Sequence, residues 1–264
     1  ATDVELETEI GDRQHTFFAQ VAPLPQGVGV VTVLHDVTRL KDADRIRRDF
    51  VANASHELRT PLTAIRGFAE TLLHGAADDP AARDRFLNAI LRHTMRLQRL
   101  AEDLTLLAKS ESPQHDFVDA PTDVRAVCRE SIASLDTFAK KKKIAVRLDA
   151  PAEPVLVVTS ARALDGALIN LIENAIKYSP EDSEVRVAVS RDEDTVTIAI
   201  SDDGPGIPAK YHERIFERFY RVDKGRSRDE GGTGLGLSIT RHLVNRMDGT
   251  LELESAPGEG TTFR

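Results

Sequence analysis

The sequence is poor in cysteine and contains no tryptophan. Cys128 is its single cysteine, so an internal disulfide and a cysteine–histidine zinc cluster are both excluded. A lone cysteine within a helical pattern is usually a small apolar core residue, which we expect of Cys128. No run approaches the ~18 consecutive apolar residues of a membrane span, and no signal-peptide pattern is visible. These absences predict a soluble chain of a reducing compartment, or the soluble part of something larger.

Positive charge is also in deficit. The 264 residues carry 35 Lys and Arg against 43 Asp and Glu, a formal net charge of −8. Because affinity for nucleic acid comes mainly from accumulated Lys and Arg, we expect no direct nucleic-acid binding. Hydrophobic residues make up 41%, which is enough for folded cores. At ~100–200 residues per domain, the length predicts one large domain or two to three small ones.

The N-terminal 38 residues favour β-strands. Two β-branched and aromatic runs, residues 16–24 and 29–37, flank a turn at Pro25–Gly27. Two or three antiparallel strands are too few for an independent domain. We therefore expect this segment to be the tail of a larger sheet domain.

From Thr38 the periodicity becomes helical. Apolar residues recur every three or four positions from Leu40 to Leu72, and again from Phe86 to Ala108 after a turn around Pro80. These patterns predict two amphipathic helices in a hairpin. Because a hairpin covers its own apolar seam poorly, we expect it to dimerise into a four-helix bundle.

The polar, proline-containing stretch Lys109–Pro121 is predicted to be a linker. Beyond it, helices and strands interleave. The predicted helices are Val124–Ala139, Ala161–Lys177 and Leu237–Met247, and the predicted strands are 144–148, 155–158, 184–189, 195–201 and 250–255. Mostly antiparallel strands with interleaved helices indicate an α+β sandwich.

The first helix contains a candidate reactive histidine. At 100° per residue, His56 lies about 200° around the helix from Ala54 of the apolar seam, so it points to solvent. Glu57 can accept a hydrogen bond from one imidazole nitrogen, which makes the other nitrogen more nucleophilic. Thr60 is one turn further along the same face. Pro61 removes an interior N–H and is predicted to kink the helix beside His56.

A second motif lies on the helix predicted for Ala161–Lys177. Asn170, Asn174 and Lys177 fall at positions i, i+4 and i+7, on one face. Two carboxamides and an ammonium suit oxyanions and a hard, partly hydrated cation such as Mg²⁺. The alternative for this motif alone is an ordinary solvated face.

Two glycine-containing segments complete the set. In Asp202–Pro208, glycines permit close approach of a flat ligand, and an aspartate can accept from an exocyclic amine. In Glu230–Leu237, glycine-rich backbone leads directly into a helix, which is typical of a phosphate cradle. No Lys-Ser/Thr follows these glycines, so the segment is not a Walker A loop. The antiparallel strands argue against a Rossmann fingerprint.

In this combination and order, the four motifs resemble those of the sensor histidine kinases of two-component signalling. The resemblance covers residues 1–264 and is strongest to the phosphate-regulon type, in which the tail of a PAS domain enters the dimerisation helix directly. It implies four parts: a C-terminal PAS-like segment at 1–38, a dimerisation and histidine phosphoacceptor domain at 39–110, a linker at 111–121, and a catalytic ATP-binding domain at 122–264. The last part is expected to be an α/β sandwich of the gyrase/Hsp90/histidine-kinase type.

The resemblance also implies an activity. His56 matches the phosphoacceptor, Glu57 the adjacent general base, and Thr60 the residue that positions water for phosphatase activity. ATP with Mg²⁺ would phosphorylate His56, and the phosphoryl group would pass to an aspartate of a cognate response regulator. The expected assembly is a homodimer, and the chain would be the cytoplasmic portion of a protein that is anchored in a bacterial inner membrane through segments outside this sequence.

The resemblance also implies roles for the residues of this sequence that match the motifs of the family. Asn174 matches the Mg²⁺-coordinating asparagine, Asp202 the aspartate that recognises the adenine amino group, and Arg221 a phosphate-contacting arginine. The segment Asp223–Glu230 matches the mobile lid over ATP. The other expected nucleotide-binding residues are Asn170, Lys177, Tyr178, Gly204, Gly206, Ile207, Phe219, Gly232, Thr233, Gly234, Leu235, Gly236 and Leu237.

Two other functions remain open from sequence. One is a clamp-type ATPase on the same ATP-binding fold, as in the gyrase, Hsp90 and MutL families. Those proteins place a water-activating glutamate where this chain has Asn170, so hydrolysis here is expected to be slow. The other is a non-catalytic dimeric signalling scaffold, against which the intact His56 and Glu57 weigh.

Overall fold

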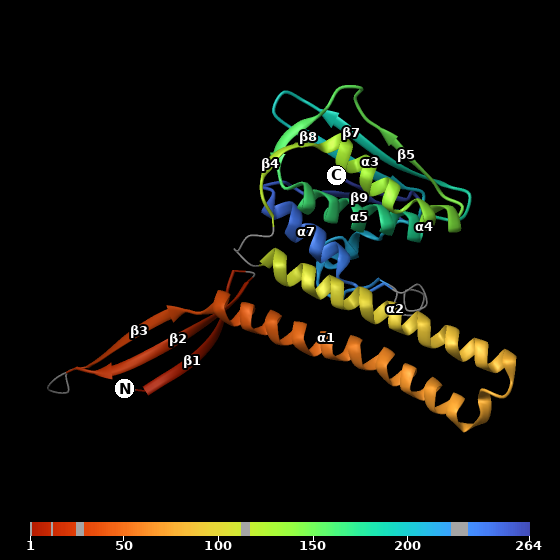
Figure 1. The fold of residues 1–264 in the computed structure, drawn as a ribbon. Coiled ribbons are helices and arrows are strands. Elements are labelled where there is room, and N and C mark those ends of the chain that lie inside the picture. Colours follow the sequence, from red (N-terminus) through yellow and green to blue (C-terminus); the bar gives the residue numbers. More distant parts are fainter. Residues whose placement is uncertain (1, 12, 25–28, 112–116, 223–231) are drawn as a thin grey trace. The chain divides into compact units, whose positions relative to one another are not determined.

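The computed structural model describes residues 2–11, 13–24, 29–111, 117–222 and 232–264 (Figure 1). The chain divides into two compact units, Ala1–Thr60 and Pro61–Arg264, which are described separately. In the first unit, the strands β1 (Thr2–Ile10), β2 (Arg13–Pro23) and β3 (Val30–Asp36) form an antiparallel sheet in the order β1-β2-β3. The two predicted strands are confirmed, and β1 adds a third.

This small sheet has little core of its own. Val33 and Leu34 are neighbours on β3 and therefore point to opposite faces, yet their side chains are 44% and 56% exposed. Among the described side chains of residues 1–38, only that of Ala19 is buried. The sheet thus needs a further layer to be stable. This is consistent with the tail of a larger domain, and the PAS-like assignment stays a prediction.

Helix α1 (Thr38–Thr71) begins where polar side chains satisfy its first backbone groups. The Thr38 N–H donates to Asp36 Oδ1 at 2.9 Å, and the Thr38 hydroxyl accepts from the Thr16 N–H at 2.9 Å. The helix assignment continues through Pro61. The chain then reverses through a short π-helical turn, η2 (Leu72–Ala76), in which Gly75 takes a positive φ of 105°. The predicted helical hairpin is therefore confirmed.

Helix α2 (Pro80–Glu111) begins at a proline, whose missing N–H costs nothing in a first turn. The helix ends later than predicted: residues 109–111, which were expected to belong to the linker, are helical. Tertiary packing explains the extension: Leu107 and Ser110 are buried, and the Ser110 hydroxyl donates to the Leu107 carbonyl at 2.8 Å. Residues 112–116 of the predicted linker lie outside the described residues.

The rest of the second unit is the predicted α+β sandwich. Its elements are β4 (Ala120–Asp123), α3 (Val124–Ser134), α4 (Asp136–Lys141), β5 (Ala145–Asp149), β6 (Leu156–Thr159), α5 (Ala161–Tyr178), β7 (Glu184–Arg191), β8 (Val196–Asp202), η3 (Ala209–Tyr211), η4 (Arg214–Phe216), α7 (Gly236–Arg246), β9 (Leu253–Ser255) and β10 (Thr261–Phe263). The main sheet has the order β5-β7-β8-β10-β9, with β5 parallel to β7 and the other pairs antiparallel. Strands β4 and β6 form a separate antiparallel pair. The helix predicted for Val124–Ala139 is instead two helices that meet at Leu135.

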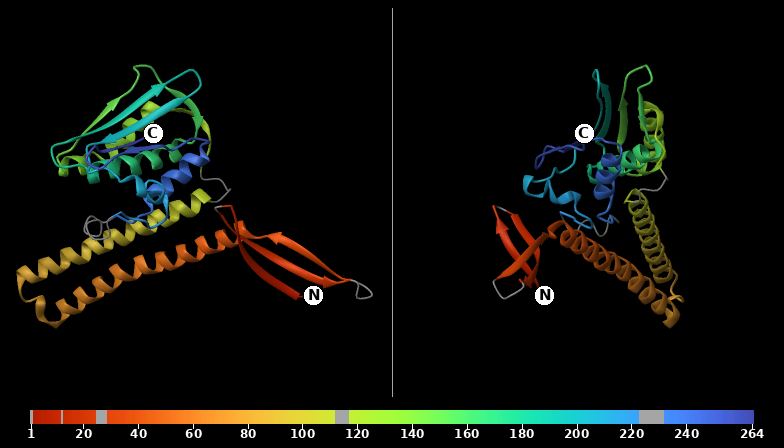
Figure 2. Two further views of the ribbon diagram at one scale, coloured as in Figure 1. Left: turned by 180° about the vertical axis from the view of Figure 1, so that it is seen from behind. Right: turned by 90° about the vertical axis from the view of Figure 1, so that its left-hand side faces the viewer.

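Helices α3 and α5 pack on one face of the main sheet, and α7 packs against α5 (Figures 1 and 2). Alternate residues of β7, Val185, Val187 and Val189, are buried, as expected of a strand with one covered face. Cys128 on α3 is fully buried, and burial raises the pKa of its thiol to about 12. The expectation that Cys128 is a small apolar core residue of a helix is confirmed.

In the residues that the structure describes, no helix combines the length and the apolar character needed to cross a bilayer.

Candidate functional site

A cavity of about 1230 Å³ opens in the second unit, between α5, the segment after β8, the segment before α7, and α2. Three of the four sequence motifs meet here, although they lie far apart in the chain. The predicted residues that line the cavity are Asn170, Asn174, Lys177, Tyr178, Asp202, Gly204, Gly206, Ile207, Arg221, Gly232, Thr233, Gly234, Gly236 and Leu237. The structure therefore gathers most of the predicted binding residues into one site.

Helix α5 presents its polar face to this cavity. The Ser160 hydroxyl caps the helix by accepting from the Ala163 N–H at 3.3 Å. On the opposite face, Ile172 and Ile176 are fully buried in the core, which fixes the rotation of the helix. Asn170, Asn174 and Lys177 therefore line the cavity together, as their spacing predicts.

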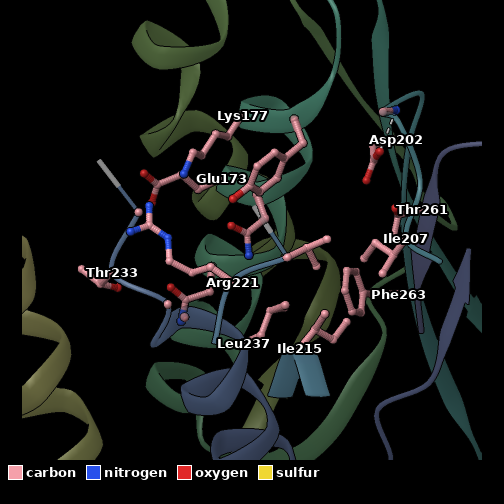
Figure 3. A pocket seen from close by; sticks show the side chains of 18 of the residues that line it. Glu173, Lys177, Asp202, Ile207, Ile215, Arg221, Thr233, Leu237, Thr261 and Phe263 are labelled. Atoms are coloured by element: carbon pink, nitrogen blue, oxygen red, sulfur yellow. Dashed lines mark hydrogen bonds between the residues drawn. The ribbon is translucent and has the colours of Figure 1, made fainter. Parts of the chain in front are cut away.

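One end of the cavity holds the cations of Lys177 and Arg221 beside the carboxylate of Glu173 (Figure 3), and it is lined in part by bare backbone. A Cβ at Gly232 would stand 2.7 Å from Lys177 Nζ and 3.6 Å from Arg221 Nη2, so a side chain here would crowd both cations. Lys177 is only 8% exposed, and its Nζ lies 4.9 Å from the centroid of the Tyr178 ring. Figure 3 shows Lys177, Arg221 and Thr233 on the same side of the cavity. Two cations beside exposed backbone form a site suited to oxyanions.

Two predicted binding residues have a different position. Leu235 is fully buried, and neither Leu235 nor Phe219 belongs to the described lining of the cavity. Instead, the Phe219 N–H donates to the Gly234 carbonyl at 2.8 Å. This bond ties Phe219 to the glycine-rich segment, whose Gly236, the first residue of α7, lines the cavity. The predicted lid, Asp223–Glu230, lies outside the described residues.

The other end of the cavity holds a desolvated carboxylate. Asp202, the last residue of β8, accepts from the Gly204 N–H at 2.8 Å. Burial raises the pKa of Asp202 to about 6, against the opposing effect of this hydrogen bond. Figure 3 shows Asp202, Thr261 and Ile207 across the cavity from Lys177 and Arg221. A carboxylate acceptor at one end and cations at the other suit a ligand with an amine at one end and phosphates at the other.

Helix α2 adds a residue that sequence reasoning missed. The Thr233 hydroxyl donates to Asp103 Oδ2 at 2.6 Å, and burial raises the pKa of Asp103 to about 6. Nearby, Arg99 Nη1 lies 3.9 Å from Glu173 Oε1. Since Asp103 and Thr233 are 130 positions apart, no local pattern could have indicated this contact.

The candidate reactive histidine lies in the first unit and is described by itself. His56 is exposed on α1, as its position off the apolar seam predicts. The Thr60 hydroxyl donates to the His56 carbonyl at 3.1 Å, so Thr60 is tied to the turn that carries the histidine. Glu57 is half-buried. The catalytic roles of these three residues remain predictions.

The donors around the cavity fit Mg²⁺. The described residues contain no cluster of three or more His, Cys, Asp or Glu side chains that could hold a metal by themselves. Mg²⁺ usually keeps several waters and takes one or two protein oxygens together with substrate phosphates. The amide oxygens of Asn170 and Asn174, close to a cationic phosphate-type site, meet this requirement.

Two family models match the chain. Residues 46–113 match the His Kinase A (phospho-acceptor) domain, and residues 159–264 match the histidine kinase-, DNA gyrase B- and HSP90-like ATPase. The second description alone would include the clamp-type ATPases. The first separates the chain from them, because it places a phosphoacceptor domain ahead of the ATPase domain.

Two curated relatives are similar over most of the chain. The phosphate regulon sensor protein PhoR of Pseudomonas aeruginosa is 39% identical over 231 residues, which are 88% of this chain and 52% of the relative. The sensor histidine kinase WalK of Bacillus subtilis is 39% identical over 239 residues, 89% of this chain and 39% of the relative. The chain thus spans only about half or less of the length of these relatives.

Solved structures show the same architecture. The Acinetobacter baumannii histidine kinase AdeS matches with a TM-score of 0.62 at 26% identity, over 79% of this chain and 95% of AdeS. Full-length ShkA in complex with AMPPNP matches with a TM-score of 0.58 at 25% identity, over 81% of this chain and 44% of ShkA. The histidine kinase ThkA in complex with response regulator protein TrrA matches with a TM-score of 0.67 at 22% identity. The match covers 99% of this chain and 77% of the ThkA chain. This last match concerns the fold alone.

Proposed function

The chain belongs to the sensor histidine kinases of two-component systems, and from this premise we propose that it phosphorylates itself on His56 with ATP. The observation that carries the proposal is that one chain combines an exposed histidine on a phosphoacceptor helix with an ATPase-type cavity. A buried or seam-facing histidine could not meet a phosphoryl donor. His56 is exposed, so its ring is accessible for transfer.

The cavity orients ATP through its two unlike ends. Lys177 and Arg221 neutralise the phosphates at the cationic end, and Gly232 leaves room for them beside both side chains. Asp202, which lines the other end, would accept a hydrogen bond from the adenine amino group. Because the two ends lie on opposite sides of the cavity (Figure 3), they fix the direction in which the nucleotide lies.

The transfer itself forms one bond and breaks one bond. An imidazole nitrogen of His56 attacks the γ-phosphorus, the bond from that phosphorus to the β–γ bridging oxygen breaks, and ADP leaves. Glu57 takes the proton that the attacking imidazole gives up. Phosphoryl transfer depends mainly on positioning and on charge neutralisation, which are the contributions of Lys177 and Arg221. Mg²⁺, held by Asn174 with Asn170 beside it, would supply further charge neutralisation at the phosphates.

We further propose a homodimer. Leu87, Leu91 and Met95 lie four residues apart on α2 and are 49%, 58% and 49% exposed. Such a stripe on one helix face is typical of a surface that is buried in an assembly. A second copy of the chain that completes a four-helix bundle would cover it.

The phosphoryl group would pass from His56 to an aspartate of a response regulator, and Thr60 would support the reverse function, dephosphorylation of that regulator. The ThkA complex supports a partner of this kind only through its likeness in fold. The Thr60 side chain is one helical turn from His56. It is therefore close enough to orient a water molecule beside the histidine. We also propose that the full-length protein is anchored in the membrane through segments outside this sequence.

Incubation with γ-labelled ATP and Mg²⁺ tests the kinase proposal. We expect a label that acid releases and base does not, which is the stability of phosphohistidine. His56→Gln should abolish it, whereas His74→Gln, which changes another exposed histidine of the same hairpin, should leave it intact. Undiminished labelling of His56→Gln would refute the assignment.

A further inference from the structure

The amine-binding end of the cavity is assembled from two chain segments that lie against each other. One segment runs from Asp202, the last residue of β8, through Gly206 and Ile207; the other connects β9 to Thr261, the first residue of β10. Each segment is in very close contact with the other. A Cβ at Gly206 would lie 1.8 Å from the Ala256 carbonyl oxygen, so no side chain fits between them.

A backbone bond from the Gly258 N–H to the Pro205 carbonyl, at 2.8 Å, links these segments, and one side-chain hydroxyl links them at a second point. Ser255, the last residue of β9, accepts from the Ile207 N–H at 2.8 Å and donates to the Gly260 carbonyl at 2.7 Å. Its oxygen also lies 3.1 Å from Thr261 Oγ1. A serine hydroxyl has one proton and two lone pairs. Since the proton goes to Gly260, the Thr261 hydroxyl must be the donor to Ser255.

Three bonds at one oxygen use its full capacity, and each leads to a different part of the site. Ile207 and Thr261 line the cavity, and Thr261 pairs with Asp202 across the β8–β10 ladder. Gly260 packs so closely on Asp202 that a Cβ there would be 2.0 Å from the Asp202 carbonyl oxygen. Ser255 itself is absent from the described cavity lining.

We propose that Ser255 is a positioning residue for nucleobase recognition. Its hydroxyl sets the spacing between Ile207 on one segment and Thr261 on the other, and thereby fixes where Asp202 presents its carboxylate. Ser255 acts through these residues and does not touch the nucleotide. This inference rests on the proposed function of the cavity as an ATP site.

The chain contains a matched control. Ser201 makes a comparable hydroxyl pair with Thr262, at 2.9 Å, across the neighbouring position of the same β8–β10 ladder. Neither Ser201 nor Thr262 is part of the described cavity lining. Ser201→Ala therefore removes a similar hydrogen bond from the same sheet without uncoupling the two segments.

Calorimetry on the 264-residue chain tests the proposal with adenosine, ADP and GDP as probes. Ser255→Ala should lower the affinity for adenosine and for ADP by the same factor, about 5- to 10-fold. This is the loss expected when one hydrogen bond no longer positions its partners. It should also narrow the preference for ADP over GDP. Ser255→Thr keeps the hydroxyl and should restore both quantities, whereas Ser201→Ala should leave them within about twofold of the unmodified chain.

The possible results distinguish a failure of the proposed ATP site from a failure of the proposed role of Ser255. If the unmodified chain binds no adenine nucleotide, the proposed function is wrong, and this inference is wrong with it. If the unmodified chain binds ADP but Ser255→Ala leaves the affinity and the ADP preference unchanged, only the inference is overturned. An equal loss in Ser201→Ala would also overturn it, because the effect would then be general loosening of the sheet. Should Ser255→Ala fail to fold, Ser255→Cys carries the same expectation, since a thiol is a much weaker hydrogen-bonding group.

Discussion

His56 and Asp202 occupy opposite environments. His56 is exposed on the side of one helix, whereas Asp202 is partly buried in a cavity, where burial raises the pKa of its carboxyl group to about 6. An exposed ring can meet more than one partner in turn, as a phosphoryl carrier must. A desolvated carboxylate has a fixed set of neighbours and strong local electrostatics, as recognition requires. The two regions should therefore fail separately when they are mutated.

The strongest way to test this separation is to remove the proposed metal ligand. Asn174→Ala should abolish Mg²⁺-dependent nucleotide binding, because a methyl group offers no oxygen to the cation. The exposed Asn245 of α7 provides a matched control, and Asn245→Ala should bind normally. Calorimetry with a non-hydrolysable ATP analogue measures both. Affinity near that of the unmodified chain in Asn174→Ala would remove Asn174 from the metal site.

The next effect concerns the packing that builds the cavity. Gly206 and Gly258 both have positive φ, +70° and +85°, but only Gly206 faces a neighbour within contact distance of an added Cβ. Gly258→Ala should cost about 1 kcal/mol of unfolding free energy for backbone strain alone. Gly206→Ala should cost about 2 to 5 kcal/mol, because overpacking is added to the strain.

Denaturant unfolding measures the stability of both glycine variants. The difference between them gives the cost of the contact between a Cβ at position 206 and the Ala256 carbonyl. Labelling of His56 should fall in Gly206→Ala through loss of nucleotide binding, while α1 keeps its helix content. If the two variants lose equal stability, the close approach of Gly206 to Ala256 is not a constraint on the fold.

A smaller effect is expected at the carboxylate. In the unliganded folded chain, Asp202 has a pKa of about 6, above the ordinary 3.8. The folded state therefore binds the proton more tightly than the unfolded state, and the stability contributed by this group is lost as pH rises from about 4 to about 6. Asp202→Asn cannot ionise, so its melting temperature relative to the unmodified chain should rise between about pH 4 and about pH 6 and level off above that range.

The same variant should bind nucleotide less selectively. An amide is an ambiguous partner for the adenine amino group, so the preference for ATP over GTP should narrow by about 10-fold. Asp194→Asn changes an exposed aspartate outside the described cavity lining and serves as the control for both measurements. A stability difference independent of pH would contradict the raised pKa, and an unchanged ATP preference would contradict the recognition role.

The smallest effect on kinase activity is expected at Thr60. Its hydroxyl is bonded to the His56 carbonyl within the helix, so Thr60→Ala should leave autophosphorylation near that of the unmodified chain while slowing dephosphorylation of the regulator. Thr71→Ala removes an equivalent hydroxyl-to-carbonyl bond, to Gly67 at 2.8 Å on the same helix, and should affect neither reaction. Paired time courses measure both. An equal reduction of the two reactions in Thr60→Ala would make Thr60 a structural residue of the helix.

Several features follow from sequence alone because their physics is local. The exposure of His56 depends only on helical periodicity relative to Ala54, and the shared face of Asn170, Asn174 and Lys177 depends only on their spacing along one helix. The glycine-rich segment before α7 was likewise evident from composition. These predictions succeeded because a helix with one apolar face leaves little freedom in where its polar residues point.

Other features depend on contacts between residues far apart in the chain. Asp103 meets Thr233 across 130 positions, and α2 extends past Lys109 because Ser110 is buried there. Leu235, which was predicted as a binding residue, has a fully buried side chain outside the described cavity lining, since sequence cannot tell which side chain of a glycine-rich segment faces inward. The sequence by itself thus determined the helix faces and the chemical groups available. Only the tertiary structure decided which groups share a cavity, how deeply Asp202 and Asp103 are desolvated, and that the Ser255 hydroxyl bonds to both Ile207 and Gly260. Burial and distance are properties of packing and not of local pattern.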